Sequence, residues 1–590
     1  MPWSLESRMW YLFVIACGFP LASPAPSHAD SPHKSASLES SAQILAQGTN
    51  PAGDRNQERF PQPAPSPEPL PPQTQPEIQP TPTPEVTPPQ QDSVTVQVEK
   101  IEVTGSTLFN AEQFNTITQP LVGRSVTLEQ LQQAADAITQ LYLEQGYITS
   151  RAILANPTNP GSVVEIRVIE GGIEEIQVQG TQRLKPDYVR SRVALGVSKP
   201  LSTAKLEEQL RLLQADPLLS NVEASIRPGV GAGQSILVIR VTEAQAFNAA
   251  FTIDNYSPPA IGSERLGINT TYRNVTGLGD ELSASYYRTT RGGANNYDFS
   301  YRVPLNPMNG TIQLRTALSD NKIVQEPLNV LDIQGESELY EISFRQPLVR
   351  SLRHEFALSL GFTVQNGQTF TFAGPTPFGF GPDEDGNSRT RIIKFTQDYL
   401  RRDTQGAWLF RSLFSFGIDA FDATKNVDPI PDGDFFSWLG QIQRVQRLNS
   451  DNLLIVQGEI QLTPDSLLPA QQFIIGGGQS VRGYRQNVRA GDNGFRFLVE
   501  NQITVQRDAG GNPTLQFVPF FNLGYVWNIP DNPNTLQRQK FLAGIGLGLL
   551  WELIPRLNLR LDYGLPLVEL DDRGQNAQDD GFYFSVGYRL

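Results

Sequence analysis

The chain has 590 residues, which exceeds a single ordinary domain and predicts several modules. Its 61 Asp and Glu residues outnumber 47 Lys and Arg residues, an acidic balance that argues against a general nucleic-acid binder. The single cysteine, Cys17, lies near the N-terminus, and the three histidines, His28, His33 and His354, offer almost no material for a zinc site or a catalytic triad. We therefore expect no enzyme and no metal or cofactor, although composition alone does not exclude a serine or carboxylate site.

The first 29 residues have the layout of a secretory signal peptide. Arg8 precedes an apolar run from Met9 to about Ala22, which is too short to span a bilayer as a helix. Ser27-His28-Ala29 then offers a small-x-small cleavage site. An alternative is lipidation of Cys17 in "VIAC". Both predict export, and since no longer apolar run follows, any membrane domain must be built from strands.

Two segments without a strand pattern follow the signal peptide. Within 30–50, Leu38, Ala42 and Leu45 have helical spacing, so a short helix is expected there. Residues 51–94 are dominated by proline, as in "PAPSPEPLPPQTQPEIQP". Proline removes backbone donors and favours extended conformations, which predicts a semi-rigid, solvated linker.

A repeated unit comes next. "VEKIEVTG" at 98–105 matches "IEEIQVQG" at 173–180, and "IRVIEG" at 166–171 matches "IRVTEA" at 239–244. Between these segments both copies carry two helical patterns and two alternating strands. In the first copy Thr127 and Gln130 form a capping box. The sequence therefore predicts two β-α-α-β-β domains, 95–171 and 172–245, each of roughly 75 residues and large enough to fold alone.

From residue 246 onward, helical periodicity gives way to two-residue alternation. In "LNLRLDYG" (557–564) the apolar residues oppose Asn558, Arg560 and Asp562. Such a pattern fits a soluble sandwich or a transmembrane barrel whose apolar face points outward. The length of 246–590 and an alternating final strand, "GFYFSVGYRL", favour a barrel, in which the last strand pairs with the first. Each strand with its connection takes roughly 20–22 residues, which predicts about 16 antiparallel strands. The predicted fold class is therefore a transmembrane β-barrel preceded by two small α+β domains.

One stretch interrupts the strands: "FIIGGGQSVRGYRQN" at 473–487. Gly476, Gly477 and Gly478 allow positive φ and are predicted to form a loop hinge. They lead to the tetrad Val481, Arg482, Gly483 and Tyr484. No helix follows, so the stretch is neither a phosphate loop nor a nucleophile elbow. It is either an ordinary surface loop or a loop whose Arg482 is held in the barrel lumen by a polar wall residue.

"SVRGY" resembles the defining loop motif of the outer-membrane superfamily that contains barrel-protein insertases and two-partner secretion transporters. The resemblance implies that this loop folds back into the barrel, where its arginine meets the acidic residue of an F-x-D-x-G motif. Here "FFNLG" at 520–524 supplies Phe520 and Gly524, but Asn522 stands in place of the aspartate. Asn522 can accept a hydrogen bond from Arg482, which is weaker than an ion pair. Asn522→Asp would then restore the ion pair and strengthen the contact.

The two repeated domains resemble the polypeptide-transport-associated (POTRA) domains of the same superfamily. Insertases usually carry three or more of them, whereas transporters of the haemolysin and filamentous-haemagglutinin type carry two, preceded by a linker and often a plug helix. The resemblance implies an outer-membrane transporter with periplasmic POTRA domains. It also implies that the client is a secreted adhesin- or haemolysin-like exoprotein, exported unfolded. Other implied partners are outer-membrane lipid and, through the C-terminal strand, the barrel-assembly machinery.

Two other functions remain open. An insertase would need lateral opening between the first and last strands, and a passive porin or solute receptor would not need the repeated domains. In α+β units of this kind an edge strand can bind an unfolded client through its backbone, with little demand on sequence. Alternatively, the two units only brace the barrel.

Overall fold

The computed structural model describes residues 79–80, 95–155 and 163–590. The predicted signal peptide, Cys17, the helix expected within 30–50 and all of the linker except Gln79–Pro80 lie outside the described residues. Within the described ranges, no helix is both long and apolar enough to cross a membrane.

The first repeat unit packs two helices against a small sheet. Its elements are β2 (Thr95–Gln97), β3 (Lys100–Thr104), α4 (Ala111–Thr118), η1 (Gln119–Leu121), β4 (Ser125–Thr127), α5 (Leu128–Glu144), β5 (Arg151–Leu154) and β6 (Val163–Ile169). The sheet order is β3-β6-β5, and β2 pairs with β4. The predicted capping box forms, because the Thr127 and Gln130 side chains each accept the other's backbone N–H at the start of α5. Leu131, Ile138 and Tyr142 of α5 lie in the core.

The second repeat unit has the same plan. It contains β7 (Gly172–Gln179), α6 (Pro186–Ala194), α7 (Thr203–Gln214), β8 (Leu219–Pro228) and β9 (Gln234–Glu243). Leu206, Leu210 and Leu213 of α7 pack into its core. The sheet order is β1-β8-β9-β7, in which β1 (Gln79–Pro80) comes from the proline-rich linker and pairs in parallel with Ser225 and Ile226 of β8.

Matching glycines follow β3 in the first unit and β7 in the second. Gly105 has φ +83° and Gly180 has φ +88°, a conformation that favours glycine. A side chain at either position would also overlap a carbonyl oxygen of the neighbouring strand, that of Val168 or Val241. The glycine is therefore repeated in the sequence because both units need the same backbone conformation and the same close approach of a neighbouring strand at this position.

Matching glutamates then hold the turn that follows each glycine. Glu170 accepts the backbone N–H of Thr107 at 2.7 Å, and Glu243 accepts those of Gln182, Arg183 and Leu184 at 2.7–2.9 Å. Burial raises the pKa of each carboxyl, but these hydrogen bonds outweigh it and leave both pKa values below the ordinary one. Glu170 and Glu243 are the glutamates of "IRVIEG" and "IRVTEA".

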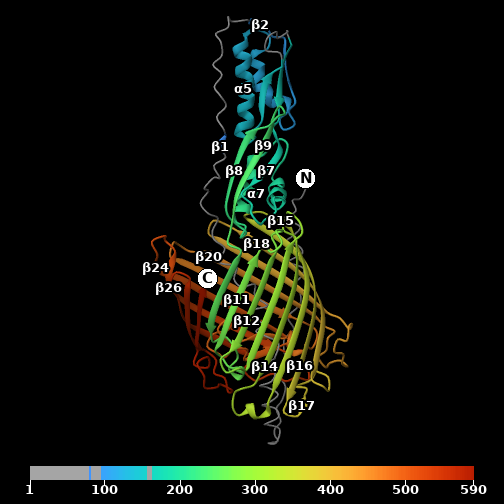
Figure 1. Ribbon diagram of the computed structural model, residues 1–590, viewed down its shortest axis with the longest axis vertical. Coiled ribbons are helices and arrows are strands. Elements are labelled where there is room, and N and C mark those ends of the chain that lie inside the picture. Colours follow the sequence, from blue (N-terminus) through green and yellow to red (C-terminus); the bar gives the residue numbers. More distant parts are fainter. Residues whose placement is uncertain (1–78, 81–94, 156–162) are drawn as a thin grey trace. The chain divides into compact units, whose positions relative to one another are not determined.

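Residues 247–589 form a closed antiparallel barrel (Figure 1). Its wall strands are β10 (Phe247–Asp254), β11 (Arg265–Arg273), β12 (Glu281–Thr289), β13 (Ala294–Pro304), β14 (Thr311–Lys322), β15 (Gln334–Arg350), β16 (His354–Thr371), β18 (Asn387–Arg402), β19 (Gly406–Gly417), β20 (Phe436–Arg447), β21 (Asn452–Leu462), β24 (Asn493–Arg507), β25 (Pro513–Trp527), β26 (Phe541–Ile554), β27 (Leu557–Pro566) and β28 (Phe582–Arg589). Because β16 pairs directly with β18, the two-residue β17 (Gly374–Pro375) is a side pairing, and the wall has the expected 16 strands.

The barrel closes between its first and last strands. Ala250–Asp254 of β10 pair with Ser585–Arg589 of β28, so the final strand leaves no open edge. Short 3₁₀ helices η2 (Pro259–Ile261), η3 (Leu328–Leu331) and η4 (Pro469–Gln471) lie in the connections.

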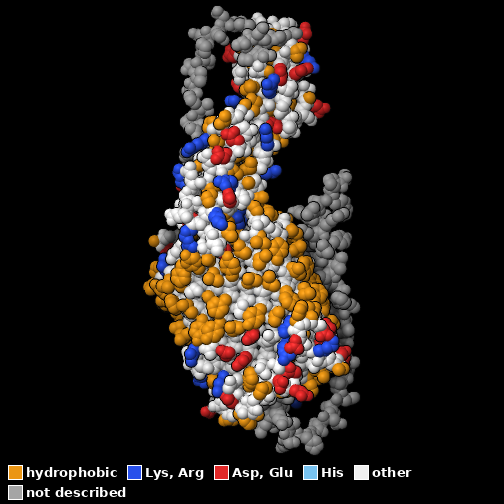
Figure 2. Space-filling model, turned by 45° about the vertical axis from the view of Figure 1, so that its right-hand side comes forward, with side chains coloured by type: hydrophobic (Ala, Val, Ile, Leu, Met, Phe, Trp, Pro, Cys, Tyr) orange, Lys and Arg blue, Asp and Glu red, His pale blue; other side chains and the backbone are white. Residues whose placement is uncertain are grey.

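The outer face of the barrel is apolar. Figure 2 shows a broad belt of hydrophobic side chains across the visible face of the wall, with charged side chains gathered beyond it. Outward-facing members of the belt are half exposed, among them Leu266, Leu314, Ile342, Leu360 and Tyr563. A soluble sandwich would bury these residues, so the apolar-out alternation identifies a transmembrane barrel.

Candidate functional site

The glycine-rich loop between β21 and β24 folds onto the inner face of the barrel wall. It contains a short hairpin, β22 (Phe473–Ile475) with β23 (Arg489–Gly491), and the tetrad lies between the two strands. Val481, Arg482 and Tyr484 are at most 3% exposed. The loop is therefore packed, and an ordinary exposed surface loop does not describe it.

Arg482 reaches three strands of the wall. Its Nη2 lies 3.1 Å from Oε2 of Glu500 on β24, and its Nη1 lies 3.3 Å from Oδ1 of Asp562 on β27. Its Nε donates to Oδ1 of Asn522 on β25 at 3.3 Å. The guanidinium also lies 3.4 Å from the ring centroid of Phe520, a cation–π contact.

A second arginine completes the charge balance. Arg560 of β27 lies 3.2 Å from Glu500 and 2.6 Å from Asp562, the same carboxylates that contact Arg482. Two guanidiniums thus face two carboxylates, and the cluster is neutral. Buried charges are tolerated only when they are paired and hydrogen-bonded. Glu500 and Asp562 therefore provide the negative charge that Asn522 lacks.

All three predicted wall residues touch the loop or its arginine. Phe520 and Asn522 contact Arg482 as described, and a Cβ at Gly524 would lie 3.1 Å from Ile475 and 3.2 Å from Val481. One polar atom stays without a partner, since Nδ2 of Asn522 makes no hydrogen bond within the described part of the chain. The amide is fully buried, so this unmade bond carries a desolvation cost.

Three successive inward positions of β26 are glycines. A Cβ at Gly544 would overlap the carbonyl oxygen of Arg482, and one at Gly548 would overlap Oδ1 of Asp562. A Cβ at Gly546 would lie 2.5 Å from the ring of Phe520. These three positions alternate along the strand, so they share the face that holds the loop. Only glycine leaves space there for the loop tip and its partners.

Gly483 and Tyr484 are held by backbone contacts. The hydroxyl of Tyr583 accepts the N–H of Gly483 at 2.9 Å and donates to the carbonyl of Tyr484 at 2.5 Å. The Tyr484 hydroxyl donates to the carbonyl of Ala543 at 2.7 Å and accepts the N–H of Val568 at 3.1 Å. Every member of the tetrad is thus fixed, with Val481 packed in an apolar cluster that includes Phe473 and Ile475.

The predicted hinge glycines are tightly packed as well. Gly476 and Gly477 have φ near +105°, and a Cβ at Gly476 would lie 2.6 Å from Val488. A Cβ at Gly478 would lie 2.5 Å from the ring of Tyr256. Close packing gives a reason for glycine at these positions, whereas a hinge motion stays a prediction.

The sequence indicated Asn522 as a partner of Arg482 but missed the ionic partners. Glu500, Asp562, Arg560 and Tyr583 come from three separate strands, and only the barrel register brings them together. A signal existed for two of them, because the alternation in 557–564 already placed Arg560 and Asp562 on the polar face. Nothing in the spacing of Glu500 singled it out from other polar-face residues.

Comparisons with known proteins agree with this architecture. The family model described as "Haemolysin secretion/activation protein ShlB/FhaC/HecB" matches residues 233–550, and one described as "POTRA domain, ShlB-type" matches residues 96–171. The chain is 23% identical over 416 residues to the outer membrane transporter CdiB of Escherichia coli, covering 67% of both chains.

Solved structures show the same fold. The structure of CdiB from Escherichia coli matches with a TM-score of 0.63 at 19% identity, covering 94% of this chain and 98% of that one. BamA from Haemophilus ducreyi lacking POTRA domains 1–3 matches with a TM-score of 0.51 at 16% identity, covering 84% and 100%.

Proposed function

Because this chain belongs to the haemolysin secretion/activation protein family ShlB/FhaC/HecB, the family of two-partner secretion transporters, we propose that it exports an unfolded exoprotein. Family members are transporters and not enzymes; the barrel lies in the outer membrane and the POTRA region in the periplasm. The proposed client is one large adhesin- or haemolysin-like exoprotein. That client is bound by the two repeat units and passes through the barrel without nucleotide.

The edge of β8 is the proposed docking strand. An edge strand presents free N–H and C=O groups, to which an extended chain can add. The linker segment Gln79–Pro80 already pairs there, at Ser225 and Ile226 only. This pairing supports the proposal, since it places an extended segment on that edge. Among the described residues, Leu219 to Ala224 of β8 pair with no strand other than β9, and we propose that a client strand adds there.

The buried anchor of Arg482 is the observation that carries the transport proposal. A charge cluster of two arginines and two carboxylates, with a strand of glycines, holds one loop against the lumen side of the wall. A passive porin does not need a loop that is anchored in this way. We propose that the anchor sets how far the loop intrudes on the client's route.

An insertase is the competing function. It would require opening between β10 and β28, which in this structure are joined by five paired residues on each strand. The similarity to BamA concerns the fold alone. Two repeat units and the family match favour the transporter.

The first step of the test is to look in the neighbouring reading frame for a large repetitive secreted protein, the candidate client. Its export is then scored in the medium of cells that carry both genes. Deleting residues 98–244 is expected to abolish export while the barrel still inserts, as judged by heat-modifiable migration of the membrane fraction. Single proline substitutions along β8 should reduce export, because each removes a backbone donor. Unchanged export after the deletion would mean that the repeat units do not recognise the client.

A further inference from the structure

The seam of the barrel, where β10 meets β28, has a short ladder of paired residues. β10 pairs through eight residues with β11 but through five with β28. The second repeat unit, which is periplasmic, precedes β10 in the chain, so β10 ends at Asp254 on the outer side of the membrane. Because a strand held by few hydrogen bonds opens more easily, contacts at the ends of a short ladder matter most.

Asn255 continues this ladder beyond β10 with its side chain. Its backbone N–H donates to the carbonyl of Phe584 at 3.3 Å, and its Oδ1 accepts the N–H of Phe584 at 2.9 Å. Its Nδ2 donates to the carbonyl of Phe582 at 3.0 Å. Asn255 is fully buried. Because the side-chain amide takes the place of the Asn255 carbonyl opposite β28, that carbonyl can accept a hydrogen bond from another segment.

Gln578 donates this hydrogen bond. It lies in the connection 567–581 between β27 and β28 and is fully buried. Its Nε2 donates to the carbonyl of Asn255 and, at 2.8 Å, to the carbonyl of Ser257. Its Oε1 accepts the backbone N–H of Gln486 at 2.8 Å. One side-chain amide thus joins the outer end of the seam to the glycine-rich loop, with both of its hydrogens and its oxygen used.

Ion pairs hold the loop to the same connection. Nε of Arg485 lies 2.9 Å from Oδ1 of Asp579, and Nη2 of Arg489 lies 2.8 Å from Oδ1 of Asp572. Asp579 directly follows Gln578, so the Arg485 pair fixes the connection beside the amide that reaches the seam. The loop and the connection 567–581 are therefore joined at three points.

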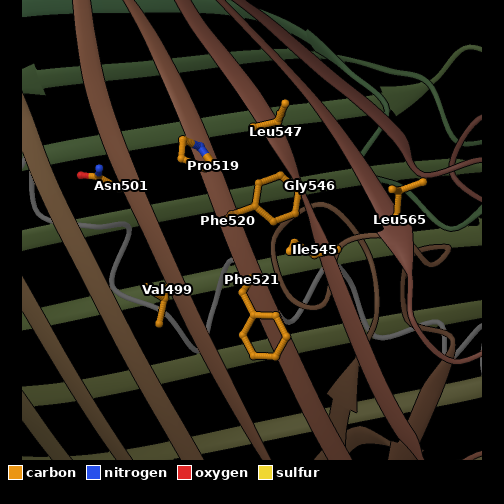
Figure 3. Close-up of a pocket in the computed structure, with 9 residues that line it drawn as sticks. All are labelled: Val499, Asn501, Pro519, Phe520, Phe521, Ile545, Gly546, Leu547 and Leu565. Atoms are coloured by element: carbon orange, nitrogen blue, oxygen red, sulfur yellow. The ribbon is translucent and has the colours of Figure 1, made fainter.

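The same loop rests on the barrel wall through Arg482. The Arg482 guanidinium lies 3.4 Å from the ring centroid of Phe520, which pairs with Gly546 on the neighbouring strand (Figure 3). Gln486 is four residues beyond Arg482, so a displacement of the loop tip reaches the hydrogen bond between Gln486 and Gln578. The anchor of the loop and the end of the seam are thus linked by a short path of described contacts.

We propose that Gln578 is a positioning residue through which the loop, residues 473–491, holds the seam between β10 and β28 closed. The loop and the seam form one coupled unit, and the outer ends of the two strands separate only after the loop has released Gln578. The inference concerns the barrel itself and is tested without a client. In an insertase, whose seam must open, the loop would have to move first.

Hydrogen–deuterium exchange of the full chain in detergent micelles, read by mass spectrometry, tests the coupling. Gln578→Glu keeps an acceptor for Gln486, but a carboxylate cannot donate to the carbonyls of Asn255 and Ser257. We expect the amides of β10 and β28 to exchange about tenfold faster than in the wild type, because buried hydrogen bonds across the seam are lost. The amides of β18 and β19 should exchange at the wild-type rate.

Asn534→Asp is the matched control. Asn534 is another buried amide in an outer connection, and its Nδ2 donates to the carbonyl of Phe380 at 2.9 Å, a residue between β16 and β18. The variant loses a comparable hydrogen bond and should leave exchange in β10 and β28 unchanged. Gln578→Met, which is uncharged and of similar length, replaces Gln578→Glu if the glutamate variant fails to show heat-modifiable migration.

A second comparison tests whether the loop acts through Gln578. Arg482→Ala should speed exchange of β10 in the wild-type background but add little in Gln578→Glu, where the link is already broken. The readout is β10, because Tyr583 of β28 contacts the loop directly. Wild-type exchange of β10 in both Gln578 variants, or an equal increase in Asn534→Asp, overturns the proposal. Full additivity of Arg482→Ala and Gln578→Glu overturns the coupling between loop and seam.

Discussion

Arg482 and Asp562 stand 80 positions apart in the chain, yet Nη1 of the arginine lies 3.3 Å from Oδ1 of the aspartate. Arg560, two residues before Asp562, contacts the same carboxylate, and Glu500 contacts both arginines. This contact places one of the two ionic partners of the loop on β27, two strands beyond the motif that contains Asn522.

Arg482→Ala should release the loop tip from the wall. The substitution leaves Glu500 and Asp562 with one guanidinium, and breaking a buried ion pair typically costs about 3–5 kcal/mol. We expect altered single-channel conductance in planar bilayers and impaired export, with normal insertion of the barrel. The control is Arg447→Ala, at the exposed end of β20. Wild-type conductance in Arg482→Ala would show that the arginine does not hold the loop.

The ionic partners should matter more than Asn522. Double-mutant cycles with Arg482→Ala isolate each pairwise term. We expect a coupling energy of roughly 1.5–3 kcal/mol with Asn522→Leu, the usual range for a hydrogen bond to a charged group. A larger coupling is expected with Asp562→Asn or Glu500→Gln, because each removes a buried charge. Conductance and thermal stability provide the readouts, and simple additivity for Asp562→Asn would contradict the observed contact.

For Asn522→Asp, the sequence motif and the structure lead to opposite expectations. The family motif alone suggests that an aspartate would strengthen the contact with Arg482. In the structure, however, it would be a third carboxylate against two guanidiniums and would leave one buried negative charge uncompensated. We therefore expect Asn522→Asp to lower the thermal stability of the barrel relative to the wild type. Greater stability would mean that replacing the unpartnered Nδ2 of Asn522 outweighs the added charge.

Gly544→Ala should displace the loop without changing any charge. Its methyl group would overlap the carbonyl oxygen of Arg482, so the loop or the strand must move. We expect a conductance change similar to that of Arg482→Ala. Gly587→Ala on β28 is the matched control, since a Cβ there has no atom closer than 4.0 Å. Equal behaviour of the two alanine variants would show that the loop is not packed on β26.

The thermal stability of the second repeat unit should fall in acid because Glu243 loses its negative charge. Three backbone N–H groups outweigh burial and keep the pKa of Glu243 below the ordinary value of 4.5. Its stabilising contribution is therefore complete above about pH 4.5 and is lost as the pH falls through the lowered value. Glu243→Gln should lower the thermal midpoint at pH 7 and weaken its dependence on acid.

Circular dichroism at 222 nm is the measurement, because α4 to α7 all belong to the repeat units within the described part of the chain. Glu175→Gln, on an exposed glutamate of β7, is the control and should leave the midpoint unchanged. An unaltered thermal midpoint in Glu243→Gln would show that Glu243 does not stabilise the turn.

Local patterns in the sequence determined most of the architecture. The repeated segments predicted two similar α+β units, because Gly105 and Gly180 meet the same backbone requirement in each. Thr127 and Gln130 located the start of α5, since a capping box depends only on residues three apart. Alternation predicted the strands, because a strand has a period of two, while the length of 246–590 and the alternating final strand favoured a barrel and gave its strand number.

The loop motif could be found in the sequence, but its environment could not. Phe520, Asn522 and Gly524 were recognisable as a motif, whereas Glu500, Asp562 and Arg560 meet Arg482 only because the strands pair in one particular register. Likewise, nothing local explains why Gly544, Gly546 and Gly548 lack side chains until the loop lies against them. Ion pairs and close packing join residues from different strands, so only the closed barrel decided which carboxylates hold the arginine.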